Sequence, residues 1–451
     1  GGAFRLGLGR QVGRQARRLD LVLVGLMNQQ RRQNGGDTGG NTASRRRSGL
    51  QTFSSLKSID FRLLWAGSIF DNLALWLQFI TLSWMVWDLT ESASLSGAAA
   101  GLRGLPTLVI GPWAGVIADR IDRRKLVIVL QIFLGVVAVF FASMVATGSA
   151  QVWHVFAYAS VSAVCFAFIM PARQSLIANT VPPENMGNAF ALSAMTVTVN
   201  RLAGGLLGGL LITTVGIQWN FFVEAGAYIA TALLLIPMKT PYQQASTARF
   251  TSVLANFKDG FRYIWRDNRI ILHLIILGII LNVVFIPVPA LLPPYASTVL
   301  GANASVGGYL LAAQGVGGIA ATVAIASLGF VIYKGKLGLI CLVLGSAAVL
   351  VLAQSHWLAL SIAMLIVLGI SQSTFIVSTQ TLIQSMTPDT LRGRITSIYM
   401  LEFGLGPIAI VLIGLLMDLT TVSGALTIVA AVSLTLSLLF LVTFRQVRGL
   451  A

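Results

Sequence analysis

The sequence predicts an all-α membrane protein in which twelve transmembrane helices form two pseudo-symmetric bundles of six. Three observations support this prediction: the composition, a series of apolar spans and an internal repeat. Of the 451 residues, 56% are hydrophobic and only 10% are charged. A soluble domain carries roughly 25% charged residues, so this composition is typical of a polytopic helical membrane protein.

Charge, cysteine content and motifs exclude several function classes. The net charge is +16, but the basic residues stand between apolar spans and form no stripe on a soluble domain, which argues against a nucleic-acid partner. Cys165 and Cys341 fall inside apolar spans, and neither a disulfide framework nor a metal-binding spacing is present. The chain has no phosphate-binding Gly-x-x-x-x-Gly-Lys-Ser/Thr pattern. We therefore expect no enzyme, no metal, no cofactor and no ATP-driven step.

The first residues differ in composition from the rest. Residues 1–50 are rich in Arg, Gly, Gln and Asn, and the apolar run at 21–26 is far shorter than the ~20 residues that span a bilayer. We interpret residues 1–58 as a disordered cytoplasmic segment. Met27 is a plausible true start, which would make residues 1–26 an extension of the natural protein.

Twelve apolar spans follow from Phe61 onward. A polar segment at 239–270 holds six Lys and Arg residues and divides the spans into two sets of six. It predicts a cytoplasmic linker between a bundle at 59–238 and a bundle at 271–445, with a cytoplasmic tail at 446–451. With boundaries good to about 2–4 residues, the spans are 62–88, 95–118, 126–147, 153–172, 189–213, 218–238, 271–296, 304–331, 337–353, 356–378, 395–417 and 421–444.

The charges of the loops predict the topology, because cytoplasmic loops carry the excess of Lys and Arg. The loops after odd-numbered spans contain neither residue type. The loops after even-numbered spans contain basic residues within 120–125, at 173, and within 239–269, 334–336 and 392–394. Both chain ends are therefore expected in the cytoplasm, and the alternation independently requires an even number of spans.

An internal repeat relates the two halves at an offset of 206 residues. The matching positions in the first half are Gln174, Leu176, Ile177, Pro182, Gly187, Gly208 and Leu210. They recur as Gln380, Leu382, Ile383, Pro388, Gly393, Gly414 and Leu416. Repeats at half-chain distance are typical of secondary transporters, in which the substrate site lies between the halves near the bilayer midplane.

Residues 115–125 read Gly-Val-Ile-Ala-Asp-Arg-Ile-Asp-Arg-Arg-Lys and lie between two apolar spans. This spacing resembles the signature of the major facilitator superfamily between its second and third helices, with Asp122 in place of the usual second glycine. Three further segments resemble the branch of macrolide-efflux proteins and enterobactin-type exporters. They are 61–65, 102–106 and 388–394, the last mirrored by 171–174.

The resemblance implies the major facilitator fold and a gate at the 115–125 loop. In the family an acid of this loop pairs with an arginine of the fourth helix, and the matching residues here are Asp119 and Arg173. The other expected gating residues are Gly115, Arg120, Arg123 and Arg124. The alternative is that the basic residues only set the topology. The run Gly204–Gly209 resembles a proton-antiporter signature, and it also predicts close helix packing.

Asp71 lies about ten residues into the first span, which is ~15 Å along a helix and near the bilayer midplane. Ionisable groups at that depth are functional hypotheses by default, because their burial is costly. We expect Asp71 to carry the coupling proton or to bind a substrate cation. The alternative is a structural ion pair with Arg103 or Arg201.

Other charges also lie inside spans. Glu402 is a second candidate for proton or substrate handling, or else a partner for Arg392, Arg394 or the expected latch. Arg201 is expected to neutralise an acid or a substrate anion, and Arg103 to close an outer gate. Glu224 is expected to be structural, and His273 to lie at the membrane interface.

Large and amide side chains on spans 1, 7 and 8 could line a cavity for a bulky amphipathic substrate. These cavity candidates are Trp76, Gln78, Asn282, Phe285 and Gln314. Span 7 should also be kinked, because its prolines remove backbone donors. They are Pro287, Pro289, Pro293 and Pro294.

The sequence thus favours a secondary transporter that works by alternating access. The expected activity is proton-coupled export of hydrophobic or amphipathic small molecules, drug-like or siderophore-like, by a monomer in a bacterial cytoplasmic membrane. One alternative is a lipid or lysolipid flippase. Another is a non-transporting receptor or assembly factor, which fixed pairing of Asp71 and Glu402 would favour.

Overall fold

The structure is a computed structural model. It describes residues 54–102, 104, 106, 110, 114, 121–182, 185–239, 253–327, 334–388, 391, 394–395, 398–399 and 402–450. The described residues from Ser55 onward belong to one compact unit. Most of the predicted disordered segment, residues 1–53, lies outside the described residues. Its end differs from the prediction, because Ser54–Lys57 form the short helix η1. The Ser55 hydroxyl holds it in place by donating to Asn188 Oδ1 at 2.7 Å.

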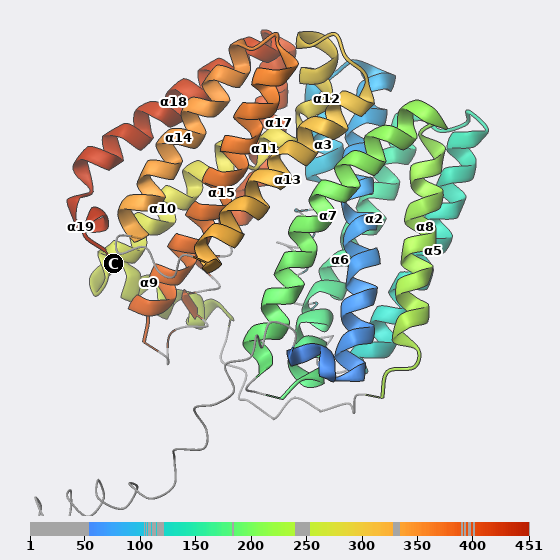
Figure 1. Cartoon of the computed structure of the whole chain (residues 1–451), viewed down its shortest axis with the longest axis horizontal. Helices are drawn as coiled ribbons and strands as arrows, with labels where there is room; N and C mark the ends of the chain where they lie inside the picture. Colours follow the sequence, from blue (N-terminus) through green and yellow to red (C-terminus); the bar gives the residue numbers. More distant parts are fainter. Residues whose placement is uncertain are drawn as a thin grey trace, which may run out of the picture. The chain divides into compact units, whose positions relative to one another are not determined.

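The first six predicted spans form one bundle with its own hydrophobic core (Figure 1). Each helix packs against neighbours of the same bundle through apolar side chains, which is how helices with few charges exclude lipid from their contacts. The helices are α2 (Ile59–Thr90), α3 (Ala93–Gly101), α5 (Arg123–Ala146), α6 (Val152–Thr180), α7 (Met186–Thr214) and α8 (Gln218–Leu235).

The last six spans form the second bundle, around a second core. Its helices are α10 (Arg269–Val284), α11 (Pro287–Ala290), α12 (Leu292–Pro294), the π-helix η3 (Tyr295–Val299), α13 (Ala304–Ser327), α14 (Lys334–Gln354), α15 (Leu358–Met386), η4 (Glu402–Gly404), α17 (Leu405–Leu419) and α18 (Val422–Thr443). The linker contributes α9 (Val253–Arg266), and α19 (Arg445–Arg448) follows α18.

The helices agree with the predicted spans, and the predicted fold class is confirmed. Within the described residues, nine helices are long and apolar enough to cross a membrane. They correspond to spans 1, 3, 4, 5, 7, 8, 9, 10 and 12. The shorter α3, α8 and α17 stand at spans 2, 6 and 11. The break of span 7 into α10, α11, α12 and η3 confirms the kink that its four prolines predict.

The first helix belongs to both cores. Its initial part, with Phe61 and Leu64, packs in the first core, whereas Ile80, Trp84 and Trp87 belong to the second. The Ser83 hydroxyl donates to the carbonyl oxygen of Ala290 at 2.7 Å. The last turns of α2 therefore connect the two bundles.

The two ends of the helical unit carry different connections. One end, called here the Asp418 end, holds the turn between α2 and α3 and the end of α17. The opposite end, called the Asp122 end, holds the start of α5 and the end of α8. The bundles contact each other mainly through α7 against α13 and through α3 against α17.

Candidate functional site between the two bundles

Glycines bring α7 and α13 into backbone contact. A Cβ atom added at Gly209 would lie 2.6 Å from the carbonyl oxygen of Ala304, and one added at Gly308 would overlap the carbonyl oxygen of Gly205. Thr213 and Ser305 then hydrogen-bond through their hydroxyls at 2.5 Å. This is the close packing that the glycine run predicts. It joins the bundles from the middle of both helices to the Asp418 end.

Asp418 joins α17 to the first turn of α3. Its carboxylate accepts hydrogen bonds from the backbone N–H groups of Ala93 (2.6 Å) and Ser94 (3.0 Å). It also accepts from the hydroxyls of Ser92 (2.8 Å) and Ser94 (2.5 Å). An acid at a helix N-terminus satisfies free amide groups and gains from the helix dipole. The second bundle thus caps a helix of the first.

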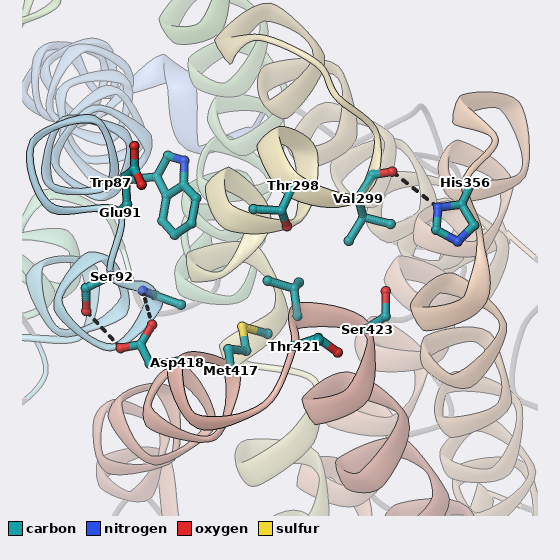
Figure 2. A pocket seen from close by; sticks show the side chains of 12 residues that line it. Trp87, Glu91, Ser92, Thr298, Val299, His356, Met417, Asp418, Thr421 and Ser423 are labelled. Atoms are coloured by element: carbon teal, nitrogen blue, oxygen red, sulfur yellow. Dashed lines mark hydrogen bonds between the residues drawn. The ribbon is translucent and has the colours of Figure 1, made fainter.

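A pocket of about 810 Å³ opens beside this cap. Figure 2 shows Trp87 and Glu91 on one side of it and His356 and Ser423 on the other. His356 Nδ1 lies 3.3 Å from the carbonyl oxygen of Val299. The pocket lies between the bundles at the Asp418 end, far along the helices from the polar residues that the sequence singles out.

A polar cluster bridges the bundles near their middle. The Arg201 guanidinium lies over the ring of Trp76, with 4.8 Å from Cζ to the ring centroid. Arg201 also donates to Gln372 Oε1 at 3.4 Å, and Gln314 donates to the same oxygen at 3.1 Å. Trp76 and Arg201 come from the first bundle, Gln314 and Gln372 from the second. The predicted cavity residues Trp76 and Gln314 are thereby brought together with Arg201.

Beyond this cluster, α15 presents a polar face toward the Asp122 end. A pocket of about 520 Å³ is lined there by Val377, Gln380, Thr381, Gln384 and Ser385. Gln380 is the repeat counterpart of Gln174, which is exposed on α6. Gln372 and Val377 are five residues apart, so the pocket begins ~7.5 Å along the helix from the cluster.

Asp71 is buried inside the first bundle. It forms an ion pair with Arg173 of α6, and Gln131 of α5 donates to its other carboxylate oxygen at 2.6 Å. The structural alternative in the sequence analysis named Arg103 or Arg201 as the partner, and the structure differs. The reason is geometric: Arg173 extends from α6 to α2, while Arg201 lies over Trp76. Arg103 lies outside the described residues.

Glu402 is only 4% exposed and lies where η4 meets α10. A Cβ atom at Gly278 would be 2.6 Å from the Glu402 carboxyl carbon, so the glycine makes room for this carboxyl group. Within the described residues, Glu402 Oε2 has no hydrogen-bond partner, and no ion pair to Glu402 is present. Of the alternative partners in the sequence analysis, Arg392 lies outside those residues.

Gln78 belongs to a different polar network, inside the first bundle. Its amide donates to Glu224 Oε1 at 2.8 Å and to Ser162 Oγ at 3.0 Å. Tyr158 and Tyr228 donate to the same Glu224 oxygen at 2.7 and 3.0 Å. Glu224 is fully buried among these donors. The structure thus places Gln78 with Glu224 and away from the cluster at Trp76.

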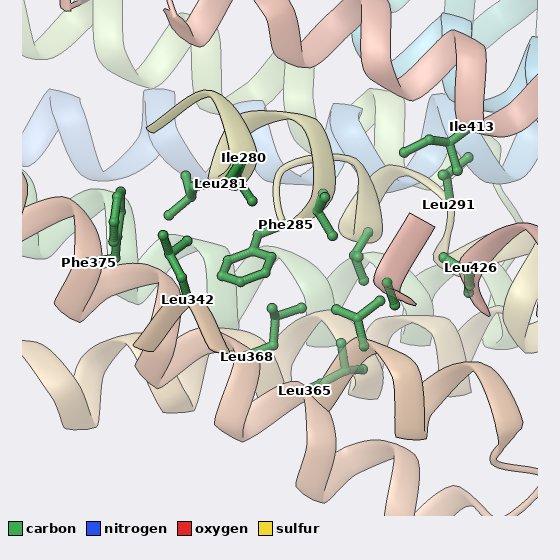
Figure 3. Close-up of a cluster of buried hydrophobic side chains, with 14 of the residues drawn as sticks. Ile280, Leu281, Phe285, Leu291, Leu342, Leu365, Leu368, Phe375, Ile413 and Leu426 are labelled. Atoms are coloured by element: carbon green, nitrogen blue, oxygen red, sulfur yellow. The ribbon is translucent and has the colours of Figure 1, made fainter. Parts of the chain in front are cut away.

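Phe285 and Asn282 also lie inside one bundle. Phe285 is 0% exposed and packs in the second core, surrounded by residues such as Leu342 and Leu368 (Figure 3). A Cβ atom at Gly345 would overlap its ring. Asn282 is buried as well, and its amide donates to the carbonyl oxygen of Gly278 at 2.9 Å. Both residues precede the kink at the prolines, and the contacts named here are made within the second bundle.

The expected gating loop is only partly described. Gly115, Asp119 and Arg120 lie outside the described residues. Asp122, which departs from the family pattern, begins α5: its carboxylate accepts from the backbone N–H groups of Arg124 (3.0 Å) and Lys125 (3.3 Å). The Arg124 guanidinium donates to the carbonyl oxygens of Leu235 (2.9 Å) and Ile236. Arg123 is the first residue of α5.

Two residues of these sites, Gln372 and Asp418, were not predicted from the sequence. Gln372 gave no signal, because α15 carries many Ser, Thr and Gln residues. Asp418 did give one: an acid in the last turn of α17 opposes the dipole of its own helix and therefore needs donors from elsewhere. No group of three or more His, Cys, Asp and Glu side chains suited to a metal occurs among the residues that the structure describes.

Known proteins resemble the chain along most of its length. A family model described as "Transmembrane secretion effector" matches residues 50–449. The staphyloferrin A transporter of Staphylococcus aureus is 20% identical over 382 residues, covering 83% of this chain and 93% of that protein. The enterobactin exporter EntS of Shigella boydii is 26% identical over 353 residues, covering 75% and 80%. An uncharacterized MFS-type transporter of Bacillus subtilis, YfiS, is 27% identical over 167 residues, covering 36% of this chain and 38% of that protein.

Solved structures share the fold at low sequence identity. The nucleoside transporter NupG superposes with a TM-score of 0.67 at 16% identity, covering 86% of this chain and 99% of its own. A D-xylose–proton symporter gives 0.66 at 14% identity, covering 86% and 99%. An inward-facing bacterial homologue of the human lysosomal transporter Spinster gives 0.61 at 17% identity, covering 87% and 95%.

Proposed function

Because the chain belongs to the transmembrane secretion effector family of major facilitator transporters, we propose that this multi-pass membrane protein exports a hydrophobic or amphipathic small molecule in exchange for protons. Two relatives are named as an enterobactin exporter and a staphyloferrin A transporter, and these names favour a siderophore-like cargo. The proposed location is the bacterial cytoplasmic membrane. The loop charges favour cytoplasmic chain ends.

The observation that carries proton coupling is the environment of Glu402. A carboxyl group buried in a membrane-spanning bundle is costly unless it is paired or does chemical work. Glu402 lies against Gly278 with Oε2 unpartnered within the described residues. A group in this position can bind a proton in one state and release it when the surrounding helices admit water or a cation. It is therefore our first candidate for the coupling acid.

Asp71 becomes the second candidate. Its carboxylate is already compensated by Arg173 and Gln131 within one bundle. Releasing it for proton transfer would require Arg173 to move away. The fixed pair is what a non-transporting receptor would show, but Glu402 has no such pair among the described residues, so transport remains the better-supported proposal.

Alternating access is supported by the distribution of contacts between the bundles. The bundles meet from Thr198 and Gly318 to Thr213 and Ser305, and again at Asp418. The pocket at Gln380 lies toward the other end. With the proposed topology, these contacts hold the bundles together toward the outside, which favours loading of the cargo from the cytoplasm.

The test is transport in proteoliposomes under an imposed pH gradient, with a panel of lipophilic dyes and macrolides. Wild type is compared with Glu402→Gln, Asp71→Asn and the control Glu224→Gln, which alters a buried acid that already has several donors. We expect gradient-driven movement in wild type and Glu224→Gln, and its loss in Glu402→Gln with cargo binding retained.

Two outcomes contradict this proposal. If Glu402→Gln keeps the response to the gradient and Asp71→Asn loses it, the coupling acid is Asp71. If no compound moves in any variant but labelled lipid crosses the bilayer, the protein is a flippase and the export proposal is wrong.

A further inference from the structure

We infer that the cluster of Trp76, Arg201, Gln314 and Gln372 binds an organic anion with a flat, conjugated body. This inference rests on the proposed function and names the chemical class of its cargo. Arg201 lies midway along α7, between the two bundles. A guanidinium at that depth needs an anion or several acceptors, because its charge is poorly tolerated in the membrane interior.

No buried acid of the described chain pairs with Arg201. Asp71 pairs with Arg173, Glu224 accepts from a set of three donors, and Glu402 lies against Gly278. Within the described residues Arg201 has no ion pair, and its one hydrogen bond, to Gln372, is long at 3.4 Å. Among the described residues, no anion balances the charge of Arg201, which is offset only by the ring of Trp76 and the hydrogen bond to Gln372.

The cluster also holds polar atoms without partners among the described residues. They are Arg201 Nε, Trp76 Nε1 and Gln314 Oε1, and all three are buried. Buried donors and acceptors without partners are rare in proteins, and several in one place indicate a missing ligand. Two are N–H donors, which suits an acceptor-rich anion, and the third is an amide oxygen that can accept from a hydroxyl or amide of the same molecule.

The chemistry of these side chains defines what would bind. A guanidinium presents paired N–H donors that match a carboxylate or phosphate in two parallel hydrogen bonds. The guanidinium lies over the indole of Trp76, and a conjugated ring of the ligand would join this stack. The amides of Gln314 on α13 and Gln372 on α15, which hydrogen-bond to each other, would contact the cargo from the second bundle. One ligand would therefore touch both bundles at once, which is how a cargo can bias their relative movement.

A pocket on α15 lies between the cluster and the Asp122 end. The pocket at Val377, Gln380 and Gln384 begins within two helical turns of Gln372 and is lined mainly by polar side chains. None of its described lining residues is charged.

The experiment is equilibrium binding to the full chain in nanodiscs of phosphatidylcholine, without any gradient. The probes share one ring system and differ in charge: 2-naphthoate, 2-naphthyl phosphate, 2-naphthalenemethanol and 2-naphthylmethylammonium. We expect both anions to bind about tenfold or more tighter than the alcohol, the ratio of one charge-assisted hydrogen bond. The ammonium compound should bind no better than the alcohol.

Variants then place the anion at the cluster. Arg201→Gln should lose the preference for anions and keep the affinity for the alcohol. Arg201→Lys should lose part of it, because the charge remains without the paired donors. The control is Arg266→Gln, which removes an exposed cation of α9 and should change nothing. Size-exclusion profiles establish that each variant is folded. If Arg201→Gln does not fold, Arg201→Lys is the variant that tests the inference.

The inference is overturned if the anions bind no tighter than the alcohol, or if neither Arg201 variant weakens them. A lipid headgroup is the other source of such an anion. Added phosphatidylglycerol should leave naphthoate binding unchanged, and competition that depends on Arg201 would assign the site to lipid instead of a soluble cargo. Failure of gradient-driven transport alongside intact anion binding would refute the proposed function and leave this site standing.

Discussion

Arg173 and Asp71 form an ion pair that connects α6 to α2 across 102 residues of sequence. Both side chains are nearly buried, at 12% and 5% exposure. Gln131 adds a third helix to the same carboxylate. The pair therefore holds the first bundle together. Because Asp71 pairs with Arg173, it does not neutralise Arg201.

Breaking this pair should destabilise the protein. Arg173→Gln or Asp71→Asn leaves one buried group without its partner, which costs roughly 3–5 kcal/mol in comparable pairs. The double variant should cost clearly less than the sum, because both charges disappear together. Thermal unfolding in detergent measures all three against Arg266→Gln. Additive losses would mean that the two residues do not interact.

Removing the Asp418 cap should loosen the end of the molecule that it closes. Asp418→Ala takes four acceptor contacts from the first turn of α3, and loss of an N-cap typically costs about 0.5–2 kcal/mol. Hydrogen–deuterium exchange of the Ala93–Gly97 amides should become faster. Glu91→Gln is the control, since it alters an exposed acid of the same pocket. Unchanged exchange in Asp418→Ala would show that the cap has no energetic role.

A methyl group at Gly308 should separate α7 from α13. Its Cβ atom would overlap the backbone of Gly205 and lie 3.1 Å from the Cα atom of Gly209, and backbone cannot rotate away as a side chain can. Gly308→Ala should therefore disfavour the closed Asp418 end and slow transport. The matched control is Gly226→Ala, which meets nothing within 4 Å. Equal transport rates in the two variants would contradict the importance of this contact.

Substitutions at Phe285 and at Trp76 should have opposite effects on stability and on binding: the first should mainly lower stability and the second mainly lower affinity. Phe285→Ala empties a site in the second core and should cost roughly 3–5 kcal/mol of stability, with little change in affinity for naphthoate. Trp76→Ala should weaken that affinity more than it lowers the unfolding temperature. Phe285→Leu provides a milder variant if the alanine form is unstable. A large loss of naphthoate binding in Phe285→Leu would instead support the prediction from the sequence that Phe285 lines the binding cavity.

The fold was predictable because it is encoded in patterns that repeat along the chain. Apolar spans, loop charges and the offset of 206 residues each recur many times, and no single residue decides the result. Individual pairings lack this redundancy. Whether Asp71 meets Arg173 or Arg201 depends on helix rotation and side-chain reach, and hydropathy is insensitive to both. The same applies to Gln78, which could face either the other bundle or Glu224.

The candidate site was predictable in its residue types and less so in its grouping. Trp76, Arg201 and Gln314 were singled out because large, charged or amide side chains are rare in apolar spans. They are brought together with Gln372 only because α7 packs against α13. Glycine spacing predicts such close packing, but it does not determine which residues of the two helices lie opposite each other. Asp122 stands where the family pattern has a glycine. The structure explains this difference, because the Asp122 side chain caps the N-terminus of α5.

The placement of Trp84 and Trp87 in the second core has a consequence for assembly. An isolated first bundle would leave both indoles without their packing partners, so neither bundle is complete until the other has folded against it. Biogenesis should then end with a docking step that buries these rings. Their fluorescence would report when the two halves of the chain have become one transporter.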